Sequence, residues 1–257
     1  MKTERSDKMI HRIIAAVTFI LISLTLFTQT DSVRIVAFGN STTAHRRGVE
    51  KVFSVRLQEK MNMAGIAAMV INAEVGSSHT GSVTDNDFAK VRHGMDRFQS
   101  DVLVHCPHWV IINFGLNDAY QDEGIHGKAR IALVKYRDNI EFFIKKIKEQ
   151  GGEVILLTPN PLGSRYEQFR ITQVEQYANC VRAIAREQEV LLVDSWELFK
   201  KHASATNVTG NIDFLYLDGI HPNDLGHEMI AEALFNLLLP QLVPTENNCR
   251  NNAVNRQ

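Results

Sequence analysis

The sequence predicts an α/β protein, a three-layer α/β/α sandwich built on a mostly parallel, five-stranded sheet. Two observations support this fold class. Five short apolar segments have the composition of buried β-strands, and most of the longer segments between them have the periodicity of amphipathic helices. Strands that alternate with helices pair in parallel, and the helices then cover both faces of the sheet.

The first half of the chain contains three of the expected strands. Residues 33–38, VRIVAF, are a compact run of β-forming residues and give the first strand. Residues 49–63 are expected to be helical, because their apolar residues recur every three or four positions. Residues 67–71 and residues 109–114, WVIINF, are the second and third apolar runs and give the next two strands.

The second half continues the alternation. Residues 131–150 are a long expected helix that two glycines stop, and residues 154–157 are the fourth strand, closed by a Thr-Pro pair. Residues 167–189 again have helical spacing, residues 190–193 give the fifth strand, and residues 223–239 give the last helix. The chain therefore supplies enough elements for one substantial domain.

The two ends of the chain differ from this pattern. Four basic residues precede the uncharged run at 13–26, which is typical of an export signal. The run is shorter than the roughly 20 residues of a membrane span, and no small-x-small cleavage site follows it. We expect residues 1–30 to be a signal peptide or an uncleaved signal anchor, residues 31–243 to form the domain and residues 244–257 to be a polar tail. The protein is then exported, either periplasmic or extracellular, with membrane anchoring as the open alternative.

The composition indicates no charged macromolecular partner. The 257 residues carry a formal net charge of -1, which gives no strong field for nucleic acid. The sequence lacks a GxGxxG loop after a strand, a P-loop and an HExxH motif, and its 3 cysteines form no CxxC pair. We therefore expect no nucleic-acid partner, no metal and no organic cofactor.

Three short segments carry polar residues suited to acyl transfer. They are Gly39-Asn40-Ser41, Gly115-Leu116-Asn117-Asp118 and Asp218-Gly219-Ile220-His221. The first follows the first expected strand, the second follows the third strand, and the last precedes the final helix. Open parallel sheets bind ligands beyond the carboxyl ends of their strands, so we expect the three segments to meet at that edge.

Ser41, His221 and Asp218 fit a catalytic triad. A serine hydroxyl is a weak nucleophile until a base takes its proton, and His221 is the candidate base. Asp218 lies three residues earlier and can fold back to accept a hydrogen bond from the imidazole, which fixes the tautomer. Each segment alone also fits a turn or a helix cap. Their occurrence together favours a hydrolase.

The chain resembles the SGNH (GDSL-type) hydrolases over residues 33–239. Those enzymes carry a Gly-Asp-Ser block, a Gly-x-Asn-Asp block and an Asp-x-x-His block in this order, and FGNST, FGLND and DGIHPND match them. The resemblance implies a flavodoxin-like sheet, no cofactor, Ser41 as the nucleophile, His221 as the general base and Asp218 as its partner. It also implies an oxyanion hole made by the Ser41 N–H, the Asn117 side-chain amide and a third N–H from the loop at residues 72–79.

Two positions depart from the family pattern. Asn40 stands where the family has an aspartate, and Ser77 falls on the position of the glycine that supplies the third oxyanion donor. Ser77 can supply this N–H provided that the loop does not demand a positive φ. We further expect Asn40, Gly76 and His79 to contact the substrate.

The sequence thus predicts a serine esterase that forms an acyl-serine intermediate. A polar rim of active-site residues and the export signal favour O-acetyl esters on carbohydrate; that rim comprises Asn40, Thr42, Thr43, Ser77, Ser78 and His79. Two alternatives remain open: a lysophospholipase or thioesterase acting on lipid esters, and a catalytically weak carbohydrate-binding protein. Arg46 and Arg47 follow the nucleophile segment and are expected to be a solvated surface pair rather than ligands for a polar substrate.

Overall fold

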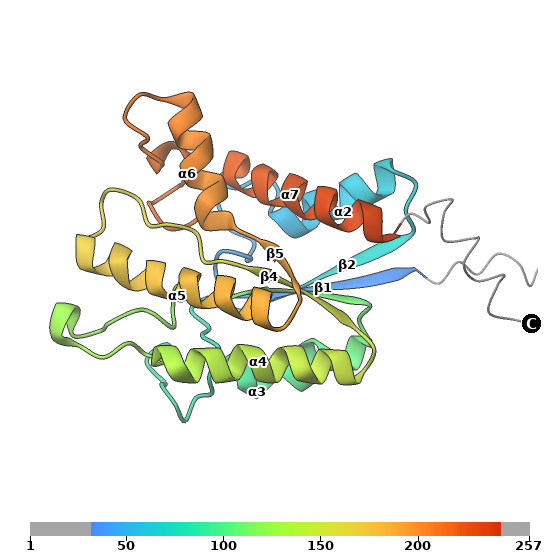
Figure 1. The fold of residues 1–257 in the computed structure, drawn as a ribbon, viewed down its shortest axis with the longest axis horizontal. Coiled ribbons are helices and arrows are strands. Elements are labelled where there is room, and N and C mark those ends of the chain that lie inside the picture. The colour runs from blue at the N-terminus through green and yellow to red at the C-terminus, as the bar shows by residue number, and fades with distance from the viewer. Residues whose placement is uncertain (1–31, 243–257) are drawn as a thin grey trace, which may run out of the picture. The chain divides into compact units, whose positions relative to one another are not determined.

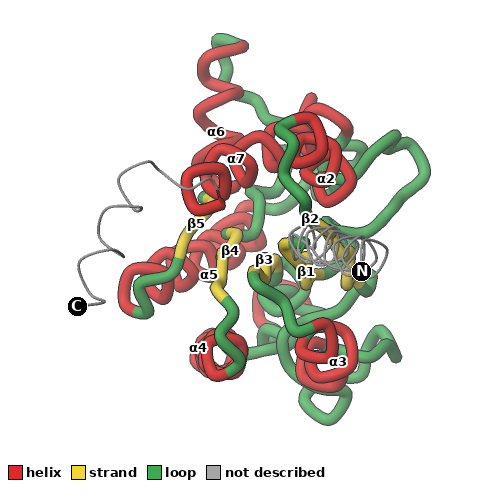
Figure 2. Tube along the Cα trace, turned by 90° about the vertical axis from the view of Figure 1, so that its right-hand side faces the viewer, coloured by secondary structure: helices red, strands yellow, loops and turns green. Residues whose placement is uncertain are grey.

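The computed structural model describes residues 32–242, so the expected export segment and polar tail lie outside the described residues. Its sheet has five strands, all parallel, in the order β2-β1-β3-β4-β5 (Figure 2). The strands are β1 (Val33–Gly39), β2 (Ala68–Glu74), β3 (Trp109–Asn113), β4 (Glu153–Leu157) and β5 (Leu191–Val193). The predicted fold class is confirmed.

Helices cover both faces of this sheet (Figure 1). One face packs against α3 (Gly94–Asp101), α4 (Leu133–Glu149) and α5 (Gln168–Glu187). The other packs against α2 (Phe53–Met63), α6 (Ser195–Thr206) and α7 (Asp224–Leu242). Among the described residues, no helix combines the length and the apolar character that a membrane crossing requires.

Strand β1 lies inside the sheet, and this position explains why its residues form a continuous apolar run. Ile35 and Ala37 belong to the core under α2 and α7, whereas Val36 and Phe38 belong to the core under α3 and α4. All four are fully buried, with 0% exposure. A strand covered on both faces needs apolar residues at every position rather than at alternate ones.

Two helices were missed by the sequence prediction, and the largest difference in a helix boundary is at the start of α2. α3 and α6 were not expected, and α2 begins at Phe53 rather than at residue 49. The later start has a physical cause. The backbone N–H groups of Glu50 and Lys51 donate to the Asp224 carboxylate, so these residues are held in a connecting segment instead of a helical turn.

Strand β2 is longer than expected at its carboxyl end. Residues 72–74 were placed in a loop, but they pair with residues 37–39 of β1. As a result Gly39 lies opposite Glu74 on one side and opposite Asn113 on the other. The neighbouring strands β2, β1 and β3 therefore end at the same level, and the loops that follow them start side by side.

Candidate active site

The nucleophile segment makes a tight turn just beyond β1. The Asn40 side-chain oxygen accepts from the Thr42 N–H at 3.1 Å and from the Thr42 hydroxyl at 2.9 Å. This side-chain turn leaves Ser41 half-buried at the carboxyl edge of the sheet. A side chain at Gly39 would come within 2.9 Å of the Asn113 carbonyl oxygen, so the close approach of β1 to β3 requires glycine there.

Ser41, His221 and Asp218 form one hydrogen-bonded line. The Ser41 Oγ lies 3.0 Å from His221 Nε2, and His221 Nδ1 lies 2.7 Å from Asp218 Oδ2. The second carboxylate oxygen, Oδ1, accepts from the His221 N–H at 2.9 Å. Asp218 therefore holds both the ring and the backbone of His221, and the imidazole keeps its free nitrogen toward the serine.

The loop that carries His221 is fixed by its own backbone. Gly219 has φ +80°, a conformation that other residues adopt at a cost, and a side chain there would collide with Arg165 at 2.8 Å. The Leu217 N–H donates to the His221 carbonyl at 3.0 Å. Asn223 then caps α7, because its side-chain oxygen accepts from the Gly226 N–H at 3.1 Å.

The surroundings keep the base neutral and its partner charged. Burial lowers the pKa of His221 below its ordinary value of 6.5, and this outweighs the hydrogen bond that the ring donates to Asp218, which acts in the opposite direction. Burial alone would raise the pKa of Asp218, but hydrogen bonds from the His221 backbone and ring hold that pKa below 3.8. A neutral imidazole beside a carboxylate is the state that a general base requires.

Arg46 belongs to this site, although the sequence favoured a solvated surface residue. Its guanidinium Nη1 lies 4.0 Å from Asp218 Oδ2, and its side chain is 28% exposed. Its Nε is buried without a partner in the described residues. The positive charge of Arg46 also contributes to the lowered pKa of His221. Only the position of Arg46, five residues after Ser41, suggested a role in the sequence.

The three expected oxyanion donors come from loops that follow neighbouring strands. Ser41 follows the central strand β1, Ser77 follows β2 and Asn117 follows β3, so the nucleophile has a donor loop on each side. Asn117 Nδ2 donates one hydrogen to the Ser78 carbonyl at 3.0 Å, which leaves its second hydrogen free. The N–H groups of Ser41 and Ser77 have no acceptor within residues 32–242.

Ser77 adopts a positive φ, the backbone conformation that the sequence analysis named as unfavourable for a serine at this position. Its φ is +62°, in the left-handed region where glycine is preferred. Gly76, the neighbouring glycine, is exposed and would have no atom within 4 Å of an added side chain. The loop therefore places a serine at the strained position and a glycine where none is required.

The expected substrate-contacting residues have unequal positions. Gly76 is exposed, whereas Asn40 and His79 are each 1% exposed. The His79 ring stacks on the His93 ring at a centroid distance of 3.5 Å, and its Nε2 contacts the Asn86 carbonyl. Both side chains are thus inside the protein, which argues against direct contact between substrate and either Asn40 or His79.

The polar rim inferred from the sequence is correspondingly smaller. Thr42, Thr43 and Ser78 are at most 2% exposed and make hydrogen bonds within the protein, so of the six residues only Ser77 is exposed. These hydroxyls stabilise the loops rather than present donors to a ligand. The preference for carbohydrate therefore needs support from elsewhere.

A buried arginine holds the strand ends beneath the site. Arg97 of α3 is fully buried and donates to the Gly39 carbonyl at 2.7 Å and to the Ala73 carbonyl at 2.8 Å. These carbonyls belong to the last residue of β1 and the next-to-last residue of β2, just before the nucleophile loop and the Ser77 loop. Burial lowers the pKa of Arg97 to about 10. Arg97 was not among the residues expected from the sequence, because α3 itself was not expected.

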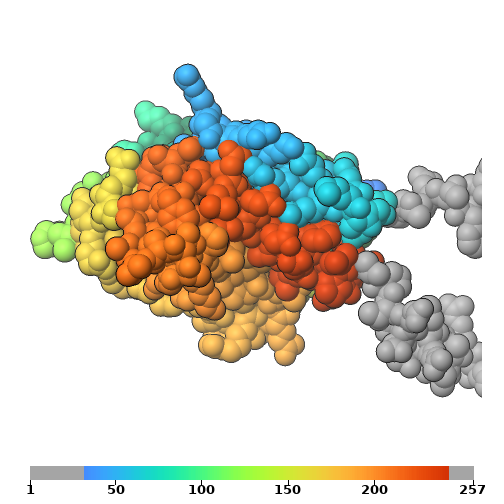
Figure 3. All heavy atoms as spheres, turned by 90° about the horizontal axis from the view of Figure 1, so that it is seen from above, coloured from blue at the N-terminus to red at the C-terminus, as the bar shows by residue number. Residues whose placement is uncertain are grey.

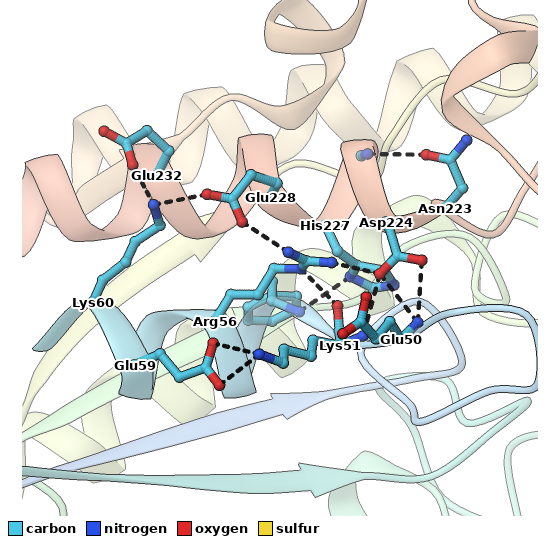
Figure 4. Close-up of polar contacts among 12 residues, drawn as sticks. Glu50, Lys51, Arg56, Glu59, Lys60, Asn223, Asp224, His227, Glu228 and Glu232 are labelled. Atoms are coloured by element: carbon cyan, nitrogen blue, oxygen red, sulfur yellow. Dashed lines mark hydrogen bonds and ion pairs between the residues drawn. The ribbon is translucent and has the colours of Figure 1, made fainter. Parts of the chain in front are cut away.

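The segments that follow Ser41 and His221 are also connected on the face of the sheet opposite α3, where α2 and α7 pack. Asp224, the first residue of α7, accepts from the Glu50 N–H at 3.0 Å and pairs with Arg56 of α2 (Figure 4). The His227 ring accepts from the Phe53 N–H at 3.2 Å. Figure 3 shows the resulting contact, with the blue and cyan surface around α2 directly beside the red surface of α7. Both loops of the triad are thus anchored to one helix pair.

No metal chemistry is indicated among residues 32–242. No three His, Cys, Asp or Glu side chains there are grouped so that they hold a metal ion. Cys106 is exposed and Cys180 is half-buried. The chemistry that the described site offers is that of serine, histidine, aspartate and amide groups.

A serine, a neutral histidine and an aspartate in line at the carboxyl edge of a parallel sheet define the class of serine hydrolases. The family model for GDSL-like lipases and acylhydrolases matches residues 35–234, so the chain belongs to that family. The resemblance stated from the sequence is confirmed, and the protein is a carboxylic ester hydrolase of the SGNH type.

Three similar proteins are informative. An uncharacterized lipoprotein, YqeF of Bacillus subtilis, is 27% identical over 64% of this chain and 71% of its own length. An acetylxylan esterase of Geobacillus stearothermophilus is 28% identical over 56% of this chain and 64% of its own length. The crystal structure of the acetyl xylan esterase AlAXEase has a TM-score of 0.65 at 22% identity and covers 80% of this chain and 100% of its own, which shows a shared fold.

Proposed function

We propose that the protein hydrolyses acetyl esters of carbohydrates, with Ser41 as nucleophile, His221 as general base and Asp218 as the group that orients the base. The observation that carries the proposal is the unbroken contact from Ser41 Oγ through His221 to Asp218, at 3.0 Å and 2.7 Å. Distances of this size allow a proton to move from the hydroxyl to the imidazole as the serine attacks.

The proposed reaction has two halves. In the first, Ser41 Oγ attacks the ester carbonyl carbon while His221 Nε2 takes the hydroxyl proton, and the same proton then goes to the leaving alcohol. In the second, His221 takes a proton from water as the water oxygen attacks the acyl-serine, and it then returns this proton to Ser41 Oγ as the bond to the acyl group breaks and acetate leaves. In both halves the negative charge on the carbonyl oxygen meets the N–H groups of Ser41 and Ser77 and the amide of Asn117.

The preference for acetylated carbohydrate is supported by the relatives. Two of the similar proteins are acetylxylan esterases, one by sequence and one by fold. Tyr120 and Tyr166 lie on the same edge as the catalytic loops, and Tyr166 is packed beside Gly219. Aromatic side chains with a polar end suit contact with sugar rings. The proposed substrate is therefore a short acyl group on a sugar hydroxyl.

One observation favours a second candidate, an esterase for longer acyl chains. A cavity of about 150 Å³ is lined mainly by apolar side chains, among them Leu116, Leu162 and Ile220. Leu116 precedes Asn117 and Ile220 precedes His221, so the cavity adjoins both segments of the site. The aliphatic part of this lining suits a hydrocarbon chain, whereas Tyr120 and Tyr166, which line the same cavity, suit a sugar ring.

An ester panel separates the two candidates. The panel contains acetylated xylooligosaccharide, 4-nitrophenyl acetate, 4-nitrophenyl octanoate and a lysophospholipid. We expect kcat/KM to be highest for the two acetyl esters and acetate to be released from the oligosaccharide. A higher kcat/KM for the octanoate and the lysophospholipid, with no acetate release, rejects the carbohydrate proposal in favour of the lipid one.

We also propose that the protein is exported by its N-terminal segment. The basic and apolar order of residues 1–30 supports this, as does the similarity to a lipoprotein. Fractionation of cells that express the full chain tests the proposal. Recovery only from the cytoplasm contradicts it, whereas recovery in the membrane fraction supports the uncleaved anchor.

A further inference from the structure

Two adjacent residues of the second catalytic segment hold the loop that carries Ser77. Asn117 Nδ2 donates to the Ser78 carbonyl at 3.0 Å, as described above. Asp118 Oδ1 accepts from the Thr80 N–H at 2.7 Å and from the Thr80 hydroxyl at 2.6 Å. Hydrogen bonds therefore fix the loop on both sides of His79, directly after Ser77, the residue with the positive φ. We call these four residues, Asn117, Asp118, Ser78 and Thr80, the oxyanion-loop latch.

The hydrogen bonds of the latch have a defined direction. Asn139 of α4 donates its side-chain amide to the Thr80 hydroxyl oxygen at 3.1 Å, so the hydroxyl proton points to Asp118. Asp118 Oδ2 accepts from the Gly115 N–H at 3.0 Å. Asp118 thus accepts three hydrogen bonds, donates none and is fully buried. The arrangement fits a carboxylate and fits an amide poorly.

We propose that Asp118 is a positioning residue that fixes the oxyanion hole by locking the Ser77 loop to the Asn117 loop. The proposal rests on the esterase function proposed above. It explains how the chain keeps a serine at φ +62°, a conformation that is unfavourable for a residue with a side chain. Hydrogen bonds to a charged group oppose this unfavourable contribution, so the latch holds Ser77 in place.

Substitutions at Thr80 give the most direct test. Thr80→Val has the same shape but lacks the hydroxyl, whereas Thr80→Ser keeps it. We expect Thr80→Val to lower kcat for 4-nitrophenyl acetate about 10- to 100-fold with little change in KM. The reason is that displacement of the oxyanion donors weakens their contacts with the transition state much more than their contacts with the bound ester. Thr80→Ser should stay close to the wild type. Equal kcat values for folded Thr80→Val and Thr80→Ser overturn the proposal.

A second substitution distinguishes positioning from general stability. Glycine adopts a positive φ without strain, so adding Ser77→Gly to Thr80→Val should recover part of the lost kcat. A residue that only stabilises the fold would not give this recovery at a temperature where both variants are folded. Absence of any recovery contradicts the proposed link between Asp118 and Ser77.

Asp118→Asn and Asp194→Asn form a matched pair. In Asp118→Asn one N–H₂ group faces the Gly115 N–H or the Thr80 donors, so we expect the same loss of kcat. Asp194 also follows a strand and accepts from Arg182, Thr158 and the Glu197 N–H, but it lies at β5. Asp194→Asn should lower stability and leave kcat unchanged. A comparable fall of kcat in Asp194→Asn overturns the specific role of Asp118.

Hydrogen exchange tests the latch independently of catalysis. The amides of Ser78, His79 and Thr80 all donate within the protein. They should exchange faster in Thr80→Val than in Thr80→Ser, and unchanged protection overturns the latch. If wild-type protein hydrolyses no ester and does not react with a fluorophosphonate, the proposed function fails, yet this exchange comparison still decides the structural claim.

Discussion

At the scale of single residues, the charge on Arg46 affects the pKa of His221, the proposed base. Burial is the main reason that the pKa of His221 is lowered, and the Arg46 cation adds to it because it disfavours a second positive charge nearby. Activity should therefore rise with pH as His221 loses its proton, with a midpoint below 6.5. Arg46→Met removes the cation and should move the midpoint to higher pH.

The pH dependence of kcat/KM for 4-nitrophenyl acetate measures this effect. Arg46→Lys is the control, because it keeps a positive charge at the same position and should shift the midpoint less. A midpoint in Arg46→Met equal to that of the wild type, or lower, contradicts the assigned influence of Arg46 on His221.

Ser77 provides a residue-scale prediction about stability. Ser77→Gly relieves the left-handed strain but increases the freedom of the unfolded chain, and at a φ of +62° the relief dominates. We expect the free energy of unfolding to rise by about 0.4–1 kcal/mol. Urea denaturation measures this free energy. Gly76→Ser is the comparison variant, because it adds a side chain at the neighbouring exposed position, where an added Cβ meets open space. A loss of stability in Ser77→Gly contradicts the strain at this residue.

The residues of the site differ in how visible they are in the sequence. Ser41, Asn117 and His221 belong to short motifs whose residue types indicate acyl-transfer chemistry. The structure brings the loops that carry them to the carboxyl edge of the sheet. Arg46 and Arg97 act through charge and through backbone carbonyls that only the folded chain brings within reach. No local pattern encodes such contacts, so sequence reasoning had no means of finding them.

At the scale of elements, Asp224 couples α7 to the chain before α2. Its carboxylate accepts from two backbone N–H groups and pairs with Arg56 (Figure 4). Asp224→Asn keeps one acceptor but loses the charge, and we expect the free energy of unfolding to fall by about 1–2 kcal/mol. Glu232→Gln is the control, because Glu232 is exposed and its ion pair is with Lys60, at the edge of the α2–α7 contact. Chemical denaturation should show a much smaller loss for the control, and equal losses contradict the coupling.

The strands were more predictable than the helices. A parallel strand with both faces covered is apolar throughout, which makes it conspicuous in a sequence. α6 starts at a cap that Asp194 forms with the Glu197 N–H, and α3 is a short helix that follows a polar loop. Both lack a long apolar periodicity, and the boundary of α2 depends on the distant carboxylate of Asp224. Such elements depend on tertiary contacts rather than on local pattern.

At the scale of the whole molecule, buried histidines make stability depend on pH. Burial lowers the pKa of His227 to about 4, against 6.5 for the free side chain, and His93 is lowered to the same value. Between pH 4 and 6.5 the unfolded chain therefore binds more protons than the native protein. Stability contributed by these groups is complete above pH 6.5 and is lost as the pH falls toward 4. For His227 the full effect is about 3 kcal/mol, from 1.36 kcal/mol per pKa unit.

Asp118 acts in the opposite direction, because burial raises its pKa to about 6, but the two histidines outweigh it. Denaturation at several pH values should thus show stability that falls from pH 7 to pH 4. His227→Asn keeps an acceptor for the Phe53 N–H without a titrating group, and it should flatten the dependence. A slope unchanged by this substitution contradicts the role of His227.

The central claim is that Ser41 is a nucleophile activated by His221. Reaction of the wild-type protein with a fluorophosphonate, followed by mass spectrometry of the labelled peptide, tests it most directly. We predict one phosphonyl group per chain, attached to Ser41, with parallel loss of ester hydrolysis, and no labelling in Ser41→Ala or His221→Ala. Retained hydrolysis in Ser41→Ala, or stoichiometric labelling at another residue, would contradict the account.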